Sequence, residues 1–158
     1  MNKMLVAAAL AAALTGCSST PKLSEAERLT LYQAHAGADV RSFRMWGRLD
    51  GWTPLGDRAL VVWTRPQEAW LLDLMGPCQD LDYATAIALT SNTSQVHARF
   101  DSVMPLGSMV GQVGRIPCRI ESIRPLDTKA LKQAHEQLRE AQATPRPQET
   151  PDGASPAP

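Results

Sequence analysis

The chain has 158 residues, of which 16 are basic and 16 acidic, so its formal net charge is zero. This balance argues against a dedicated nucleic-acid binder, which concentrates Lys and Arg on one surface. Setting aside the two ends described below leaves about 119 residues, enough for one folded domain over 24–142 but not for two.

The N-terminus has the layout of a secretory signal peptide over residues 1–16, with Lys3 followed by an apolar run from Met4 to Leu14. That run is too short for a membrane-spanning helix, which needs roughly 20 apolar residues. The residues Leu14-Thr15-Gly16-Cys17 resemble the bacterial lipobox. The resemblance implies cleavage before Cys17 and acylation of Cys17. The alternative is an ordinary signal peptide with a chance cysteine.

Ser18 follows this cysteine. In the lipoprotein class that the motif resembles, an aspartate there retains the product in the inner membrane, so Ser18 implies the periplasmic face of the outer membrane, with the inner membrane as the alternative. Cleavage removes Lys3 and leaves 15 basic against 16 acidic residues, a net charge of −1. The lipidated cysteine and tether, residues 17–23, reach at most about 20 Å, so a partner must lie close to the bilayer.

The C-terminal segment, residues 143–158, contains five prolines among small and polar residues. It has no large apolar side chain to offset its ordering entropy, which predicts a disordered tail. The alternative is a proline-rich docking peptide.

Two cysteines, Cys78 and Cys118, remain once Cys17 is lipidated. Leftover cysteines in an oxidising periplasm most often pair, and closing a loop of about 40 residues stabilises a fold by roughly 4 kcal/mol in the chain-entropy model. The alternatives are two small buried hydrophobic residues and, least favoured without Cys-x-x-Cys spacing, a redox site.

Two helices are predicted at the ends of the domain. Ser24 and Glu27 form a capping box for a helix from Ser24 to Ala36, which Gly37 would end in a left-handed conformation. Asp127 caps a second helix that runs to about Ala143. Its inward face repeats at helical spacing through Leu131, Ala134, Leu138 and Ala141.

Between the helices the hydrophobic period changes to two. This period predicts three strands, over 43–49, 60–63 and 70–74. Turn residues separate them at Asp50-Gly51 and Arg65-Pro66 and follow the last at Gly76-Pro77, so the three strands should form an antiparallel meander. A hairpin of 84–90 with 96–100, a loop over 105–114 and a last strand over 116–121 follow. Pro117 makes that last strand an edge or its first residues irregular. The predicted fold class is α+β, an antiparallel sheet or small barrel of about six strands with a helix at each end.

The run from Arg41 to Asp127 resembles a family of small lipoproteins of unknown function in Gram-negative bacteria. The resemblance lies in hydrophobic patterns around two cysteines: Asp57–Val62, Ala69–Leu74, Cys78, Leu81, Phe100-Asp101 and Cys118–Ile120. It implies a compact β-rich domain with paired cysteines, and it transfers no activity or functional residue.

No catalytic motif, metal site or cofactor site is predicted. His35, His97 and His135 lack metal-ligand spacing. The glycine-flanked Ser108 lacks the Gly-x-Ser-x-Gly spacing of a nucleophile elbow. Asp73, Asp80 and Asp82 fit turn residues better than a carboxylate pair or a weak calcium site.

Four tryptophans and five arginines gather between residues 41 and 70. If Arg44, Trp46 and Arg48 share the outer face of the first strand, they present an aromatic ring flanked by two cations. Such a surface suits a sugar, an anionic envelope polymer or a carboxylate-rich protein. The alternative is structural, with tryptophans in the core and arginines protecting a sheet edge.

The sequence therefore favours a non-catalytic envelope module, anchored by lipid, that binds a partner protein or a cell-wall component through Arg44, Trp46 and Arg48. The alternative is a small periplasmic hydrolase with an unrecognised site. An enzyme should carry convergent polar side chains in a concave pocket, whereas a binding module should expose an aromatic patch flanked by charge.

Overall fold

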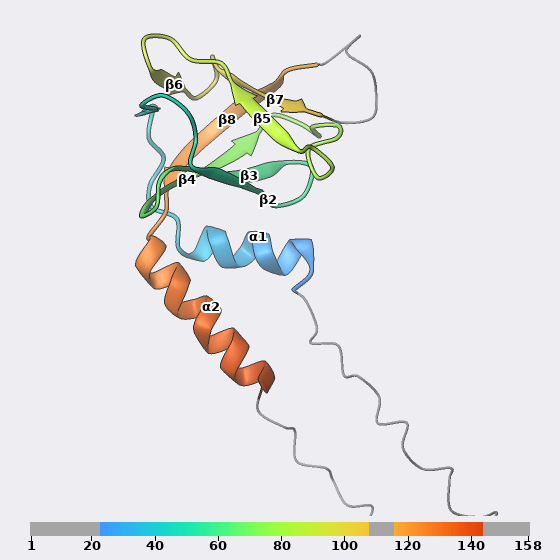
Figure 1. Ribbon diagram of the computed structural model, residues 1–158, viewed down its shortest axis with the longest axis vertical. Helices are drawn as coiled ribbons and strands as arrows, with labels where there is room; N and C mark the ends of the chain where they lie inside the picture. The colour runs from blue at the N-terminus through green and yellow to red at the C-terminus, as the bar shows by residue number, and fades with distance from the viewer. Residues whose placement is uncertain (1–22, 108–115, 144–158) are drawn as a thin grey trace, which may run out of the picture.

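The computed structural model describes residues 23–107 and 116–143 (Figure 1). Within that part the elements are α1 (Glu25–Ala34), β1 (Ser42–Arg44), β2 (Gly51–Pro54), β3 (Ala59–Arg65), β4 (Glu68–Leu74), β5 (Ala86–Leu89), β6 (Gln95–His97), β7 (Ser102–Leu106), β8 (Cys118–Pro125) and α2 (Thr128–Ala143). The predicted signal peptide, Cys17, the tether up to residue 22, residues 108–115 and the tail from residue 144 lie outside the described residues.

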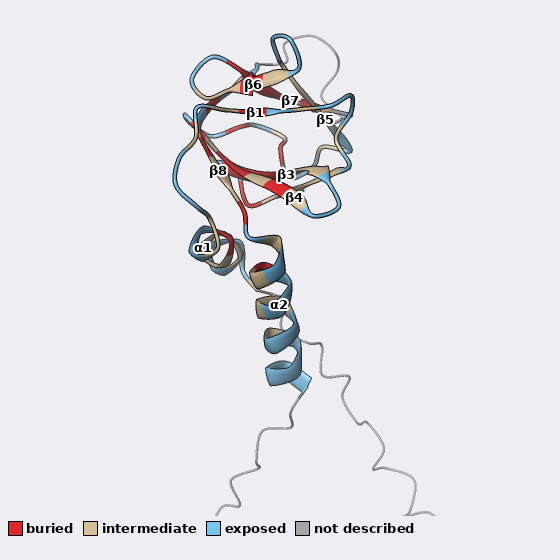
Figure 2. Ribbon diagram, turned by 90° about the vertical axis from the view of Figure 1, so that its left-hand side faces the viewer, coloured by how far each residue is buried: buried red, intermediate tan, exposed pale blue. Residues whose placement is uncertain are grey.

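Six of the strands form one antiparallel sheet in the order β2-β3-β4-β8-β7-β5. The sheet curls into a nearly closed barrel, and a two-stranded ribbon of β1 and β6 lies beside it (Figure 2). Phe43 of β1 and Val96 of β6 are register partners and point into the barrel interior, where both are buried. The predicted α+β class with a helix at each end is confirmed.

Strands β3 and β4 are covered on both faces, which explains why apolar residues occupy both phases of their alternation. Leu60 and Leu72 are register partners that face the barrel interior. Val61 and Leu71 face the other way, into a second cluster with Tyr32 of α1. The helices therefore pack on the outside of the barrel, and their buried residues belong to this second core.

Cys78 and Cys118 form a disulfide with their Cα atoms 5.5 Å apart. The bond joins the segment after β4 to the first residue of β8. The predicted pairing is confirmed, and Cys78 is also part of the interior core.

The two predicted helix starts are confirmed. Ser24 and Glu27 form the reciprocal capping box of α1. The Asp127 carboxylate accepts hydrogen bonds from the backbone N–H groups of Lys129 and Ala130 at the start of α2.

The predicted left-handed stop at Gly37 is wrong, because α1 ends at Ala34 with His35 as its C-cap and Gly37 has no positive φ. Gly37 instead donates its N–H to the carbonyl of Pro125 at 2.8 Å. A Cβ atom there would lie 3.1 Å from Cγ of Pro125, so the glycine permits a close approach of two chain segments.

The predicted first strand, 43–49, is shorter than expected and has a different partner. β1 ends at Arg44 and pairs with β6, while the meander with β3 and β4 begins at Gly51, which the sequence assigned to a turn. The turn after Arg65 forms as predicted.

The predicted hairpin of 84–90 with 96–100 is also wrong, because β5 pairs with β7. The Ser91–Ser94 turn does form, with positive φ at Thr93 and Ser94. Pro105 and Leu106, predicted as loop, belong to β7. Among the described residues, only those of β5 pair with β7 at Pro105, so a residue without an N–H is tolerated there.

β8 begins at Cys118, directly after Pro117, so Ile116 lies outside the strand and is exposed. Of the two alternatives that Pro117 predicted, the irregular first residues are confirmed. The edge position is wrong, because β8 pairs with β4 on one side and with β7 on the other.

Candidate functional site

Arg44 and Trp46 meet on the surface of the β1–β6 ribbon. The guanidinium Cζ of Arg44 lies 5.0 Å from the centre of the Trp46 ring, within cation–π range. Trp46 keeps 63% of its surface exposed, and Arg44 is exposed as well. Arg48 is exposed beyond Gly47, where φ is +79°. The strand ends at Arg44, so the three predicted residues do not share one strand face, although two of them are in contact.

The other three tryptophans have structural positions. Trp52 and Trp70 pack against the interior core, and Trp63 packs against the outer one. The Trp70 ring stacks on Phe43 with their centroids 5.2 Å apart. The structural interpretation therefore holds for these three, and it does not hold for Trp46.

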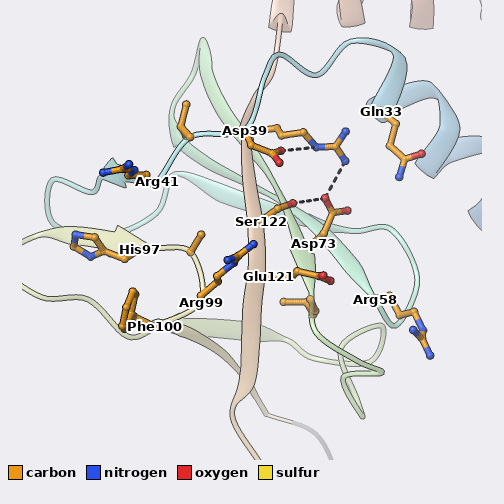
Figure 3. Close-up of a pocket in the computed structure, with 14 residues that line it drawn as sticks. Gln33, Asp39, Arg41, Arg58, Asp73, His97, Arg99, Phe100, Glu121 and Ser122 are labelled. Carbon is orange, nitrogen blue, oxygen red and sulfur yellow. Dashed lines mark hydrogen bonds and ion pairs between the residues drawn. The ribbon is translucent and has the colours of Figure 1, made fainter.

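A polar groove of about 930 Å³ lies on the outer surface over β4 and β8 (Figure 3). Its floor is a network around the Asp73 carboxylate, which accepts hydrogen bonds from the Ser122 hydroxyl at 2.7 Å and from Nη2 of Arg124 at 2.9 Å. Nε of Arg124 is buried and lies 3.9 Å from the Asp39 carboxylate. The prediction that Asp73, Asp80 and Asp82 are turn residues is confirmed for Asp80 and Asp82 and wrong for Asp73, which lies in β4 and is an ion-pair partner of Arg124.

Three arginines stand around this floor on separate segments: Arg41 before β1, Arg58 before β3 and Arg99 after β6 (Figure 3). All three are exposed, and no ion pair of theirs is found within residues 23–107 and 116–143. Glu121 lines the same groove at the irregularity where β8 shifts register against β4. These arginines leave the groove with side chains able to bind an anion.

The turn from His97 to Asp101 forms one wall of the groove. Asp101 is a buried residue, and its carboxylate accepts hydrogen bonds from the His97 N–H at 2.7 Å and from the Thr90 hydroxyl at 2.8 Å. It also lies 3.4 Å from Nδ1 of His97. Arg99 has a φ of +69°, and Phe100 at the tip of the turn is 82% exposed. Sequence reasoning missed this wall, because it placed Phe100 inside a strand.

The remaining histidines lie at the junction of the helices. The rings of His135 and Tyr32 meet edge to face with centroids 5.9 Å apart. Burial, with smaller contributions from Arg139 and His35, lowers the pKa of His135. Burial likewise raises the pKa of Tyr32.

The described part of the chain contains no group of three or more His, Cys, Asp or Glu side chains arranged to hold a metal ion. In the same residues, neither helix combines the length and the hydrophobicity needed to cross a membrane.

Comparisons with known proteins give a family and no activity. No curated protein and no solved structure matches the chain. One family model covers residues 1–142, which includes all the described elements except the last residue of α2. The chain thus belongs to DUF6491, a family of unknown function.

Proposed function

We propose that this protein is a lipoprotein anchored through Cys17 at the periplasmic face of the outer membrane, and that its domain recognises a partner there without catalysis. The charged and apolar residues 1–16 and the lipobox-like Leu14–Cys17 support the anchor. The family match begins at residue 1, so this leader falls within the pattern that the family shares.

The exposed contact of Arg44 with Trp46 carries the recognition half of the proposal. The other tryptophans of the chain pack against a core, whereas Trp46 leaves most of a large apolar ring in water. Trp and Arg are the residue types that most often dominate binding energy when a partner covers them. A carboxylate-rich protein or an anionic cell-wall component fits this pair, because each offers acceptors to the guanidinium and a surface to the ring.

The test is crosslinking followed by affinity purification of the lipidated protein from membranes. Native protein is compared with single variants Arg44→Ala, Trp46→Ala and Arg48→Ala, each first checked for an unchanged melting temperature. Tyr83→Ala is the matched control, because it removes another exposed aromatic side chain. We expect Trp46→Ala and Arg44→Ala to abolish capture and Tyr83→Ala to retain it. Equal capture by all variants would show that the Arg44–Trp46 pair is not the binding surface.

A further inference from the structure

The polar groove over β4 and β8 carries arginine charges that the acidic residues of the groove do not pair with. Asp73 is engaged by Arg124 and Ser122 at 2.9 and 2.7 Å. Arg124 is in turn shared between Asp73 and Asp39. Three lining arginines, Arg41, Arg58 and Arg99, take no part in this network and stand at the rim. Among the described lining residues, Glu121 is the one carboxylate outside the network.

We propose that this groove is a second binding site, separate from the Arg44–Trp46 pair, and that it takes an acidic polypeptide segment. Guanidinium groups bind carboxylates through two parallel hydrogen bonds, so three rim arginines on separate segments match several Asp or Glu side chains along one extended chain. Figure 3 places lining residues on both sides of β8, with Arg41 on one side and Arg58 on the other, so a ligand that reaches both must extend across the strand.

The carboxylates of the groove distinguish a polypeptide from a polyphosphate. Asp39 is 73% exposed on its side chain, and Glu121 is exposed as well. Both are acceptors, and they would repel a ligand that carries only acceptors and negative charge. A polypeptide backbone supplies N–H donors to these carboxylates while its acidic side chains reach the arginines.

An apolar contact is available at the same site. Phe100 lines the groove between Arg99 and the buried Asp101, and 82% of its surface is exposed. A side chain of the peptide that covers Phe100 gains apolar burial next to the charge pairs. Asp101 holds the backbone of this turn, and the floor bonds hold Arg124, so the ordering cost of binding falls on the exposed rim arginines and not on the backbone of the turn or on the floor.

The experiment measures fluorescence anisotropy of a short labelled peptide of alternating glutamate and leucine, titrated with the full chain purified in detergent at low salt. We expect saturable binding that weakens as salt is added, because exposed charge pairs are screened. Arg58→Gln and Arg99→Gln should each weaken binding about threefold to fivefold, and the double variant about tenfold or more. Both substitutions keep an unbranched side chain, which matters at Arg99 because its φ is positive.

Arg65→Gln is the matched control, because Arg65 is also an exposed arginine and its partner, Glu68, lies outside the groove. Unchanged affinity in this variant supports the site. Equal binding of the native protein and the Arg58→Gln/Arg99→Gln double variant overturns it, as does equal binding of a lysine–leucine peptide. Tighter binding of inorganic polyphosphate, seen as displacement of the peptide, also overturns it.

The peptide-binding experiment tests the groove separately from the proposed function of the Arg44–Trp46 pair. Trp46→Ala should leave peptide binding in the groove unchanged, since Trp46 is not a lining residue. If Trp46→Ala loses partner capture while Arg58→Gln and Arg99→Gln bind the peptide as the native protein does, the groove proposal alone is refuted. Peptide binding that depends on Arg58 and Arg99, with partner capture indifferent to Trp46, would refute the Arg44–Trp46 proposal alone.

Discussion

Removing the Asp101 carboxylate should destabilise the whole domain. This side chain is 12% exposed and accepts hydrogen bonds from the His97 N–H at 2.7 Å and the Thr90 hydroxyl at 2.8 Å. Hydrogen bonds to a charged group contribute about 1.5–3 kcal/mol each, and an unsatisfied buried donor costs about 1–3 kcal/mol. Because the Thr90 hydroxyl can rotate toward another acceptor, we count its loss at the low end. Asp101→Ala should therefore lower the free energy of unfolding by about 3–5 kcal/mol.

The assay is urea denaturation followed by circular dichroism, with the midpoint and the slope fitted separately. Asp101→Asn keeps one acceptor oxygen and should lose about half as much stability as Asp101→Ala. Asp82→Ala removes an exposed carboxylate and should leave the midpoint unchanged. A loss below about 1 kcal/mol for Asp101→Ala would refute the reasoning, because one satisfied charged bond alone is worth more than that.

Three further predictions follow from the disulfide, the lipobox-like motif and the helix junction. The double variant Cys78→Ser/Cys118→Ser should lose about 4 kcal/mol in urea denaturation, and a reducing agent should weaken the native protein but not the variant. Cys17→Ser should abolish incorporation of labelled palmitate in cells and move the protein from the membrane fraction to the soluble fraction; labelling equal to that of native protein would refute the anchor. His135 has a pKa lowered by burial, so the unfolded chain binds its proton more readily and stability should fall as the pH drops through the unfolded pKa of about 6.5. His135→Gln should reduce the fall in melting temperature between about pH 8 and about pH 5, and a fall as large as that of the native protein would contradict this assignment.

Local signals in the sequence predicted local structure well. The capping box of Ser24 with Glu27 and the Asp127 cap depend on residues three or fewer positions apart, and both form. The strand run from Ala59 to Leu74 carries a strong apolar pattern around a short turn, and its hairpin forms as well.

Partner choice between distant strands did not follow from local pattern. Phe43 alternates with polar neighbours as a meander strand would, but its register partner is Val96, more than fifty residues away. Gly51 has a turn residue's chemistry, yet it opens the strand that pairs with β3. In both cases closure of the barrel decided the pairing, and alternation alone does not encode which strands close it.

Of the two candidate sites, the sequence predicted the one built from near neighbours and missed the one built from distant residues. Arg44 and Trp46 were found because they are near neighbours in sequence, and the structure places them in contact. The groove was missed because its floor joins Asp73 to residues about fifty positions later in the chain. No signal along the sequence links Arg41, Arg58 and Arg99, which meet only through the packing of three separate segments.

The central position of β8 sets the order in which this domain can be completed. β2, β3 and β4 form one half of the six-stranded sheet and β5 with β7 forms the other, and β8 is the strand that hydrogen-bonds to both. A chain growing or emerging from its N-terminus therefore holds two unjoined half-sheets until its last strand is available. The 40-residue span of the disulfide closes at the same moment, because Cys118 is the first residue of that strand. Folding of this domain is thus governed by its C-terminal end, and a chain truncated before residue 118 should fail to join its two halves.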